Sequence, residues 1–379
     1  PFLGIPDRTK VAMNSLSAAN TRFAFDLFQQ FKTSKKGDNI FFSPLSISSA
    51  LAMTYLGAKE NTALEIGKLW GGGMENVHHQ FQKLLTELKK PTDAYELNMA
   101  NKFYGEKKYQ FLQSSFRDHK FYLASVESVD FNNAAEESRK KINSWVEKKI
   151  KDMFPKDSLN HTILVLVNAV YFKGQWDTKF DTKNTVEKEF WLDKDTSKPV
   201  QMMRQSNVFN FTSLEDLQAK ILEIPYKGKD LSMMLLLPHE VDGLQKLEDQ
   251  LTAEKLIEWT SSQNMSNGQV DLYLPRFKVE ESYELKATLK ALGMVDAFNT
   301  KSANFSGMTG RQDLVVSKVR HKSFVEVTEE GTEAAASTDV EVIAKSAPIY
   351  PFHCDHPFLF FIKHNKTNSI LFLGRVSSP

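Results

Sequence analysis

The sequence predicts an α+β protein, and three observations support this fold class. Hydrophobic residues make up 41% and charged residues 25% of the 379 residues, as in an ordinary globular protein. Apolar residues in the first half recur at helical spacing. The second half holds short runs rich in Val, Leu and Phe, which are typical of buried strands. Because helices and strands are segregated along the chain, an α+β fold is favoured over a repeating βαβ fold.

Each predicted element follows from a local pattern. Ala24, Leu27 and Phe28 follow helical spacing, and a helix is expected to begin at a capping region over Ser17–Asn20. Val77 and its apolar partners predict an amphipathic helix over roughly 75–90. The apolar runs that predict strands are 163–172, 221–226, 231–237, 269–279, 313–319, 322–328 and 358–374. No repeat or Gly/Ser-rich linker divides the chain, so residues 13–379 are expected to form one domain.

The N-terminal stretch carries charges but no apolar core of a secretory signal. We expect residues 1–12 to be an extension, non-native or disordered, ahead of a natural start at Met13. No run approaches the ~20 apolar residues of a spanning helix, so no membrane segment is expected. A cytoplasmic location follows as the expectation, with release that needs no cleaved signal peptide as an addition to it.

The charge balance gives no overall attraction to nucleic acid or anionic membrane. Lys and Arg number 48 against 47 Asp and Glu, and the net charge is +1. The basic run 139–151 follows two glutamates and lacks interleaved aromatic residues. A solvated helix face is therefore preferred over a nucleic-acid or glycosaminoglycan patch. The single cysteine, Cys354, excludes an internal disulfide.

Signatures of common enzymes and metal sites are absent. The sequence has no G-x-S-x-G, no phosphate-binding glycine loop and no H-E-x-x-H. His353, Cys354, Asp355 and His356 are metal ligands by type. Neighbouring side chains on a strand point to opposite faces, so these four would not converge on one ion. We expect no metal, no cofactor and no enzymatic activity.

Residues 331–346 form an unusual segment. Alternate positions hold small or apolar side chains: Thr332, Ala334, Ala336, Thr338, Val340, Val342 and Ala344. This alternation spans about 13 residues, against about 5–6 in a typical strand. Small side chains would let the segment enter between two existing strands. It ends at Lys345 before Ser346, an exposed site for a trypsin-like protease. An ordinary strand followed by a surface loop is the alternative interpretation.

Several long motifs occur in a characteristic order. They are N-I-F-F-S-P-L-S-I-S-S-A-L-A-M at Asn39–Met53, L-V-N-A-V-Y-F-K-G-Q-W at Leu166–Trp176, L-P-R-F-K-V at Leu274–Val279, E-E-G-T-E-A-A-A at Glu329–Ala336 and F-H-C-D-H-P-F-L-F-F-I at Phe352–Ile362. With them the chain resembles an ovalbumin-type intracellular (clade B) serpin, and is most similar to the squamous cell carcinoma antigen group. The resemblance extends from Met13 to Pro379.

The resemblance implies a fold of three β-sheets with eight or nine helices in one domain. It also implies an exposed reactive centre loop over about 329–351. In this family a protease attacks the loop as substrate and forms an acyl-enzyme. The cut loop then inserts as a new strand of the main sheet and traps the protease covalently. The implied partner is a target protease, and we expect the inhibitor to be a monomer.

The resemblance also assigns roles within the loop. The scissile bond falls at Lys345–Ser346, and Lys345 would select trypsin-like serine proteases. Residues Val342, Ile343 and Ala344 leave papain-like cysteine proteases open as a second target class. The other alternative is a non-inhibitory serpin that acts as a binding or storage protein, but such serpins usually carry bulky or charged hinge residues. An inhibitor is favoured because the hinge in this sequence keeps the small residues of the family. The hinge consists of Glu330, Gly331, Thr332, Glu333, Ala334, Ala335 and Ala336.

Positions outside the loop match by motif too. Ser43, Ser46, Asn168 and His321 match a polar cluster beneath the point where the main sheet opens, and Trp176 matches a tryptophan at the top of that sheet. One departure lies after Glu147, where about four residues, close to one helical turn, are missing. The resemblance places this helix over the main sheet, so its shortening bears on the efficiency of inhibition.

Overall fold

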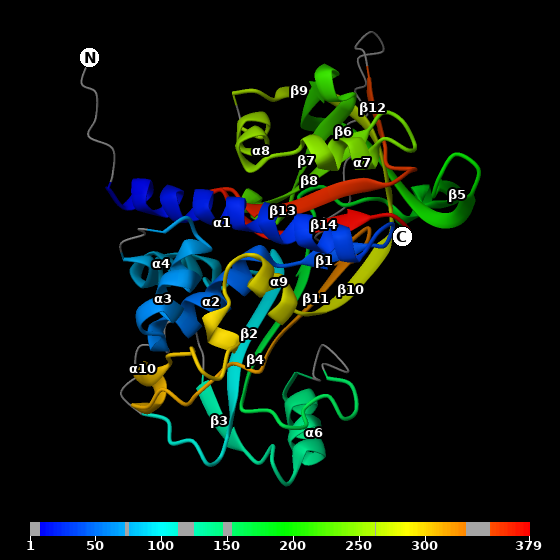
Figure 1. The fold of residues 1–379 in the computed structure, drawn as a ribbon. Coiled ribbons are helices and arrows are strands. Elements are labelled where there is room, and N and C mark those ends of the chain that lie inside the picture. The colour runs from blue at the N-terminus through cyan, green and yellow to red at the C-terminus, as the bar shows by residue number, and fades with distance from the viewer. Residues whose placement is uncertain (1–7, 73–75, 113–124, 147–153, 262, 331–348) are drawn as a thin grey trace, which may run out of the picture.

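The computed structural model describes residues 8–72, 76–112, 125–146, 154–261, 263–330 and 349–379. Within these ranges lie nine α-helices: α1 (Arg8–Ser34), α2 (Pro44–Gly57), α3 (Glu60–Lys68), α4 (Val77–Leu88), α6 (Ala135–Val146), α7 (Leu244–Gln250), α8 (Ala253–Trp259), α9 (Lys286–Ala291) and α10 (Ser306–Thr309). Figure 1 shows α1 to α4 gathered on one side of the strands.

The main sheet has five strands in the order β10–β11–β4–β2–β3. Their bounds are β2 (Tyr95–Glu106), β3 (Ser125–Val129), β4 (Leu164–Gly174), β10 (Phe277–Glu284) and β11 (Lys318–Val327). The two central strands, β4 and β11, run parallel, whereas β2 and β10 pair antiparallel with them on either side. Strand β4 is buried over most of its length, which explains its continuous apolar run.

The remaining strands follow the order β1–β14–β13–β8–β7–β6–β9–β12, and β5 also pairs with β6. Their bounds are β1 (Ile40–Phe42), β5 (Val186–Trp191), β6 (Ser197–Leu214), β7 (Ala219–Pro225), β8 (Leu231–Pro238), β9 (Ser266–Pro275), β12 (Tyr350–His353), β13 (Phe358–His364) and β14 (Ser369–Val376). The long β6 pairs with β5 through its first residues, with β9 through its middle and with β7 near its end. Strand β6 thereby joins two smaller sheets into one continuous set of paired strands. Together with the main sheet they make three sheets, and the predicted α+β fold is confirmed.

Helix α2 lies at the centre of the molecule. Ser43 caps it by accepting the Ser46 N–H, and Pro44 occupies its first turn, where a missing N–H costs nothing. All but two of its residues are buried. A helix that is apolar on every side must be enclosed, and α2 contacts α1, α4, β4 and β14.

Helix α6 packs against one face of the main sheet through a separate small core. Ile142 is buried with Tyr104 of β2 and with Val165 and Val167 of β4. Figure 1 shows α6 beside the lower end of these strands. The shortened segment after Glu147 lies outside the described residues.

Four details differ from the sequence-based predictions. Ser17–Asn20 is not a helix cap but lies inside α1, which begins at Arg8 within the expected extension. The run 269–279 is two strands, β9 and β10, separated at Arg276, and the run 358–374 is likewise two strands, β13 and β14. The run 313–319 is not a strand of its own, because its residues 314–316 are buried as irregular chain before β11 begins at Lys318. The helix predicted over 75–90 is confirmed as α4.

Candidate functional site

The predicted site residues fall into three groups. Ser43, Ser46, Asn168 and His321 come together beneath the main sheet. Trp176 and Glu330 meet at the end of β4. The other loop residues lie outside the described residues: Gly331, Thr332, Glu333, Ala334, Ala335, Ala336, Val342, Ile343, Ala344, Lys345 and Ser346.

Asn168 is the centre of the polar cluster. It lies on β4 directly opposite Asn101 of β2 on one side and His321 of β11 on the other. Its Nδ2 donates to Ser46 Oγ at 2.6 Å and also to Asn101 Oδ1. Its Oδ1 accepts from His321 Nδ1. One amide therefore bonds to three elements, β2, β11 and α2, and bridges the parallel pair at the middle of the sheet.

His321 connects this cluster to α2 and β14. Its Nε2 accepts the Ser43 N–H at 3.1 Å, so Nδ1 carries the proton. The Ser43 hydroxyl in turn donates to Leu371 O at 2.6 Å. The ring is fully buried, and burial lowers the pKa of His321 to about 3. The neutral ring is the form that this network needs.

Asn101 and Ser49 belong to the cluster but were not predicted. Asn101 Nδ2 donates to Ser49 Oγ at 3.3 Å, and Ser49 Oγ donates to Ser46 O at 2.9 Å. Both side chains are buried. Nothing near Asn101 in the sequence marks it, because its importance comes from the register of β2 against β4.

Acid is expected to destabilise the native protein partly through His321. Its pKa is lower in the folded state, about 3, than its ordinary value of 6.5. The unfolded chain therefore binds more protons between these values, and the contribution of His321 is complete above pH 6.5 and lost as pH falls toward 3. The slope is about 1.4 kcal/mol per pH unit.

Urea unfolding at several pH values between 4 and 8 would measure this dependence. The variant His321→Gln has a side-chain amide that can form hydrogen bonds but does not titrate. Its free energy of unfolding should fall less steeply with acid than that of the unchanged protein. If the free energy of unfolding fell equally steeply with acid in both proteins, His321 would not be the group responsible.

The second group surrounds Trp176, just beyond the end of β4. The indole ring stacks on Tyr226 with 4.5 Å between centroids. Its Nε1 donates to Thr328 O at 2.8 Å, and the Trp176 N–H donates to Glu330 O at 3.1 Å. Phe180 N–H donates to Glu329 O at 3.2 Å. The first residues after β11 are thus bound to the chain that follows β4.

Two ion pairs at this place were not predicted. Arg276 Nε donates to Glu329 Oε1 at 2.7 Å, and Nη2 bonds to the other oxygen, which makes the pair bidentate. Glu329 is buried, whereas Arg276 is about half exposed. Lys173 Nζ lies 3.2 Å from Glu330 Oε2, and in this pair neither side chain is buried. Neither pair has a signal in the sequence, since each joins distant segments.

Replacing Arg276 by Ala should lower the free energy of unfolding by about 2 kcal/mol, because the Glu329 carboxylate would stay buried without its partner. The variant Arg276→Lys keeps the charge but loses the second hydrogen bond and should be intermediate. Urea unfolding of the three proteins tests this. Unchanged stability of Arg276→Ala would show that Glu329 finds other partners.

The four residues from His353 to His356 bind different partners, but strand alternation is not the reason, because β12 ends at His353 and the next three residues are irregular chain. His353 Nε2 lies 3.1 Å from Asp271 of β9, and His356 Nε2 lies 2.6 Å from Pro238 O. Cys354 is buried between them, and burial raises the pKa of its thiol. Among the described residues, no group of three His, Cys, Asp or Glu side chains could hold a metal ion.

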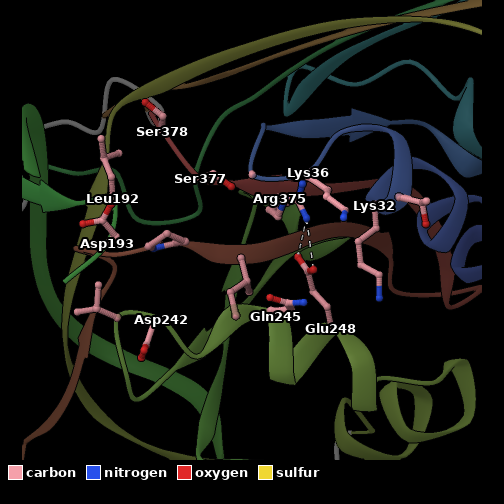
Figure 2. Close-up of a pocket in the computed structure, with 15 residues that line it drawn as sticks. Lys32, Lys36, Leu192, Asp193, Asp242, Gln245, Glu248, Arg375, Ser377 and Ser378 are labelled. Atoms are coloured by element: carbon pink, nitrogen blue, oxygen red, sulfur yellow. Dashed lines mark hydrogen bonds and ion pairs between the residues drawn. The ribbon is translucent and has the colours of Figure 1, made fainter. Parts of the chain in front are cut away.

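A groove of about 720 Å³ opens between the end of α1, α7 and the C-terminal residues (Figure 2). The buried pair Arg375 and Glu248 lies in its wall, with Nη1 3.1 Å from one carboxylate oxygen. The other two guanidinium nitrogens of Arg375 donate to Asp38 O and Lys35 O. Since all three guanidinium nitrogens donate hydrogen bonds to protein oxygens, the pair has a structural role and holds α7 against β14.

The part of the chain that the structure describes has no helix long and apolar enough to cross a membrane.

Comparison with known proteins agrees with this geometry. The model of a family described as "Serpin (serine protease inhibitor)" matches residues 18–379. Serpin B4 of Homo sapiens is 62% identical, with 97% of this chain and 100% of the relative covered. Uncleaved ovalbumin has a TM-score of 0.91 at 39% identity, over 96% of this chain and 100% of that chain. A cleaved, loop-inserted ovalbumin mutant has a TM-score of 0.85 at 36% identity, over the same shares.

These matches cover nearly the whole chain, with sequence identities from 36% to 62%. Such identities indicate membership of one family and not only a shared fold. They confirm the resemblance to ovalbumin-type (clade B) serpins of the squamous cell carcinoma antigen group. The chain belongs to the serpin family.

Proposed function

We propose that this chain is a suicide-substrate inhibitor of trypsin-like serine proteases, cleaved between Lys345 and Ser346. It acts as the substrate of another protein's active site and is not itself an enzyme. We further propose that it is a monomer that acts in the cytoplasm, with release that needs no cleaved signal peptide as an additional route.

The observation that supports this proposal most directly is the parallel pair at the centre of the main sheet. The loop leaves β11 at the end where β4 also ends. A chain that turned back there and entered between β4 and β11 would run antiparallel to both. One parallel ladder would be replaced by two antiparallel ladders, which are slightly more stable per residue. Insertion would thus add hydrogen bonds and bury a new strand.

The loop sequence suits such an inserted strand. On one face it would place Thr332, Ala334, Ala336 and the other small or apolar residues of the alternating set against the core. The interleaved face, which includes Asp339 and Glu341, would remain in solvent. The similarity to a cleaved, loop-inserted ovalbumin mutant supports insertion of such a strand into this fold.

The chemistry of trapping requires only one covalent step before insertion. The protease serine oxygen bonds to the carbonyl carbon of Lys345 while the bond to Ser346 breaks, and Ser346 takes a proton as a new N-terminus. The Lys345 ammonium would pair with the acidic residue at the base of a trypsin-like specificity pocket. Insertion would then move the ester away before water hydrolyses it.

The first test is to mix the protein with trypsin and analyse the mixture on a denaturing gel and by mass spectrometry. The proposal expects a covalent band larger than either protein and a released peptide Ser346–Pro379. Cleavage at Lys345 with no such band would contradict trapping of trypsin-like proteases. The same mixture with papain would then examine the alternative target class.

A second measurement separates inhibitory from non-inhibitory serpins. Thermal unfolding should be compared for the native and the loop-cleaved protein. A strongly raised melting temperature after cleavage supports insertion. An unchanged melting temperature would favour a binding or storage role.

A further inference from the structure

Four contacts cross the line between β4 and β11 beyond their last paired residues, Phe172 and Val325. Three are hydrogen bonds from the chain after β4 to the carbonyl oxygens of Thr328, Glu329 and Glu330. The fourth is the ion pair between Lys173 and Glu330, at 3.2 Å. Figure 1 shows β4 and β11 side by side at the centre of the sheet. Of the four, the Lys173 contact is the one that depends on a side-chain charge at both ends.

Insertion of a strand would have to break this ion pair. Neighbouring strands lie about 4.8 Å apart, so a new strand between β4 and β11 would roughly double their separation. Lys173 belongs to β4, and Glu330 follows β11 by three residues. The ion pair closes the place where the cut loop would enter. The pair also raises the pKa of the Lys173 ammonium, as expected for a hydrogen bond to Glu330.

A second exposed pair in the same sheet does not cross this line. Lys278 of β10 lies 3.7 Å from Glu326 of β11, and the two residues are direct partners in the β10–β11 ladder. Insertion between β4 and β11 would leave β10 and β11 together. Lys278 therefore provides a control on the other side of β11. Because Glu326 also attracts Lys173 electrostatically, removal of Lys278 leaves more of that attraction to Lys173 and cannot weaken the contact across the line.

We propose that Lys173 is a positioning residue for the trapping reaction, which holds Glu330 against β4 and thereby slows entry of the cut loop. The inference rests on the proposed function. Removal of the ion pair lowers the barrier to opening at the first step. Because an exposed ion pair is a weak interaction, the expected effect on the rate of insertion is about two- to fivefold.

The experiment uses the full-length protein with excess trypsin, and measures the limiting rate of covalent complex formation at low and high salt. Lys173→Gln should raise the limiting rate about two- to fivefold at low salt, and Lys173→Arg should restore the original rate. High salt should accelerate the unchanged protein but not Lys173→Gln, because salt screens an exposed pair. Lys278→Gln should not raise the limiting rate.

Urea unfolding of the native and the loop-cleaved protein distinguishes a role of Lys173 in loop entry from a general effect on stability. Lys173→Gln should lower the urea midpoint of the native protein and leave that of the loop-cleaved protein unchanged, since the pair exists only before insertion. A variant whose rate and salt dependence match those of the unchanged protein would overturn this inference alone. A chain that forms no covalent complex and gains no stability on cleavage would overturn the proposed function with it.

Discussion

Replacing Lys345 by Ala should reduce the second-order rate constant for trypsin inhibition by about thirtyfold to a few thousandfold. The lysine ammonium would be desolvated in the protease pocket and paired with a carboxylate there. Truncation of one partner of a buried charge pair costs about 2–5 kcal/mol, which corresponds to this range of rates. The measurement is the loss of trypsin activity with time at several inhibitor concentrations.

The matched control for this change is Lys345→Arg, which keeps a positive charge at the scissile bond. It should inhibit trypsin at a rate within about tenfold of the unchanged protein. Both variants should retain the same melting temperature, because the change is confined to the loop. Undiminished inhibition of trypsin by Lys345→Ala would place the reactive bond elsewhere in the chain.

Replacing Ala334 by Glu should convert the inhibitor into a substrate. The alternation places Ala334 on the face that would become buried early in insertion, and burial of an unpaired carboxylate costs several kcal/mol. Insertion would slow below the rate of deacylation, and the protease would complete hydrolysis and leave. Trypsin should then cut the Lys345–Ser346 bond without formation of a covalent band.

The adjacent residue supplies the control, since Ala335 belongs to the interleaved face that would stay in solvent. Ala335→Glu has the same added volume and charge, and it should still form the covalent complex with trypsin. If the two variants behave alike on the denaturing gel, the alternation in this segment does not describe the inserted strand.

The sequence predicted those features that depend on a few neighbouring residues. Helix α4 follows from apolar residues at helical spacing, and β4 and β8 follow from continuous apolar runs between polar residues. Ser43, Ser46, Asn168 and His321 were identified through motifs, and the structure brings them together in one hydrogen-bonded cluster.

Local patterns failed where a segment's environment decided its structure. Ser17–Asn20 has the composition of a helix cap, but Leu16 and Ala19 pack in the core, and the helix continues through them. The run 313–319 was predicted as a strand, yet its apolar residues 314–316 are buried without entering a ladder. Composition alone does not predict either outcome. The same residues can be buried in a helix, in a strand or in irregular chain, and the surrounding structure decides which.

The sequence by itself determined the fold class, the motif residues and the alternation of the loop segment. Only the tertiary structure decided that Asn101 lies opposite Asn168, that Arg276 binds Glu329 and that Lys173 binds Glu330. The physical reason is the range of the interactions. Helical and strand periodicity is set by bonds within a few residues, whereas these pairs depend on the register between strands far apart in the chain.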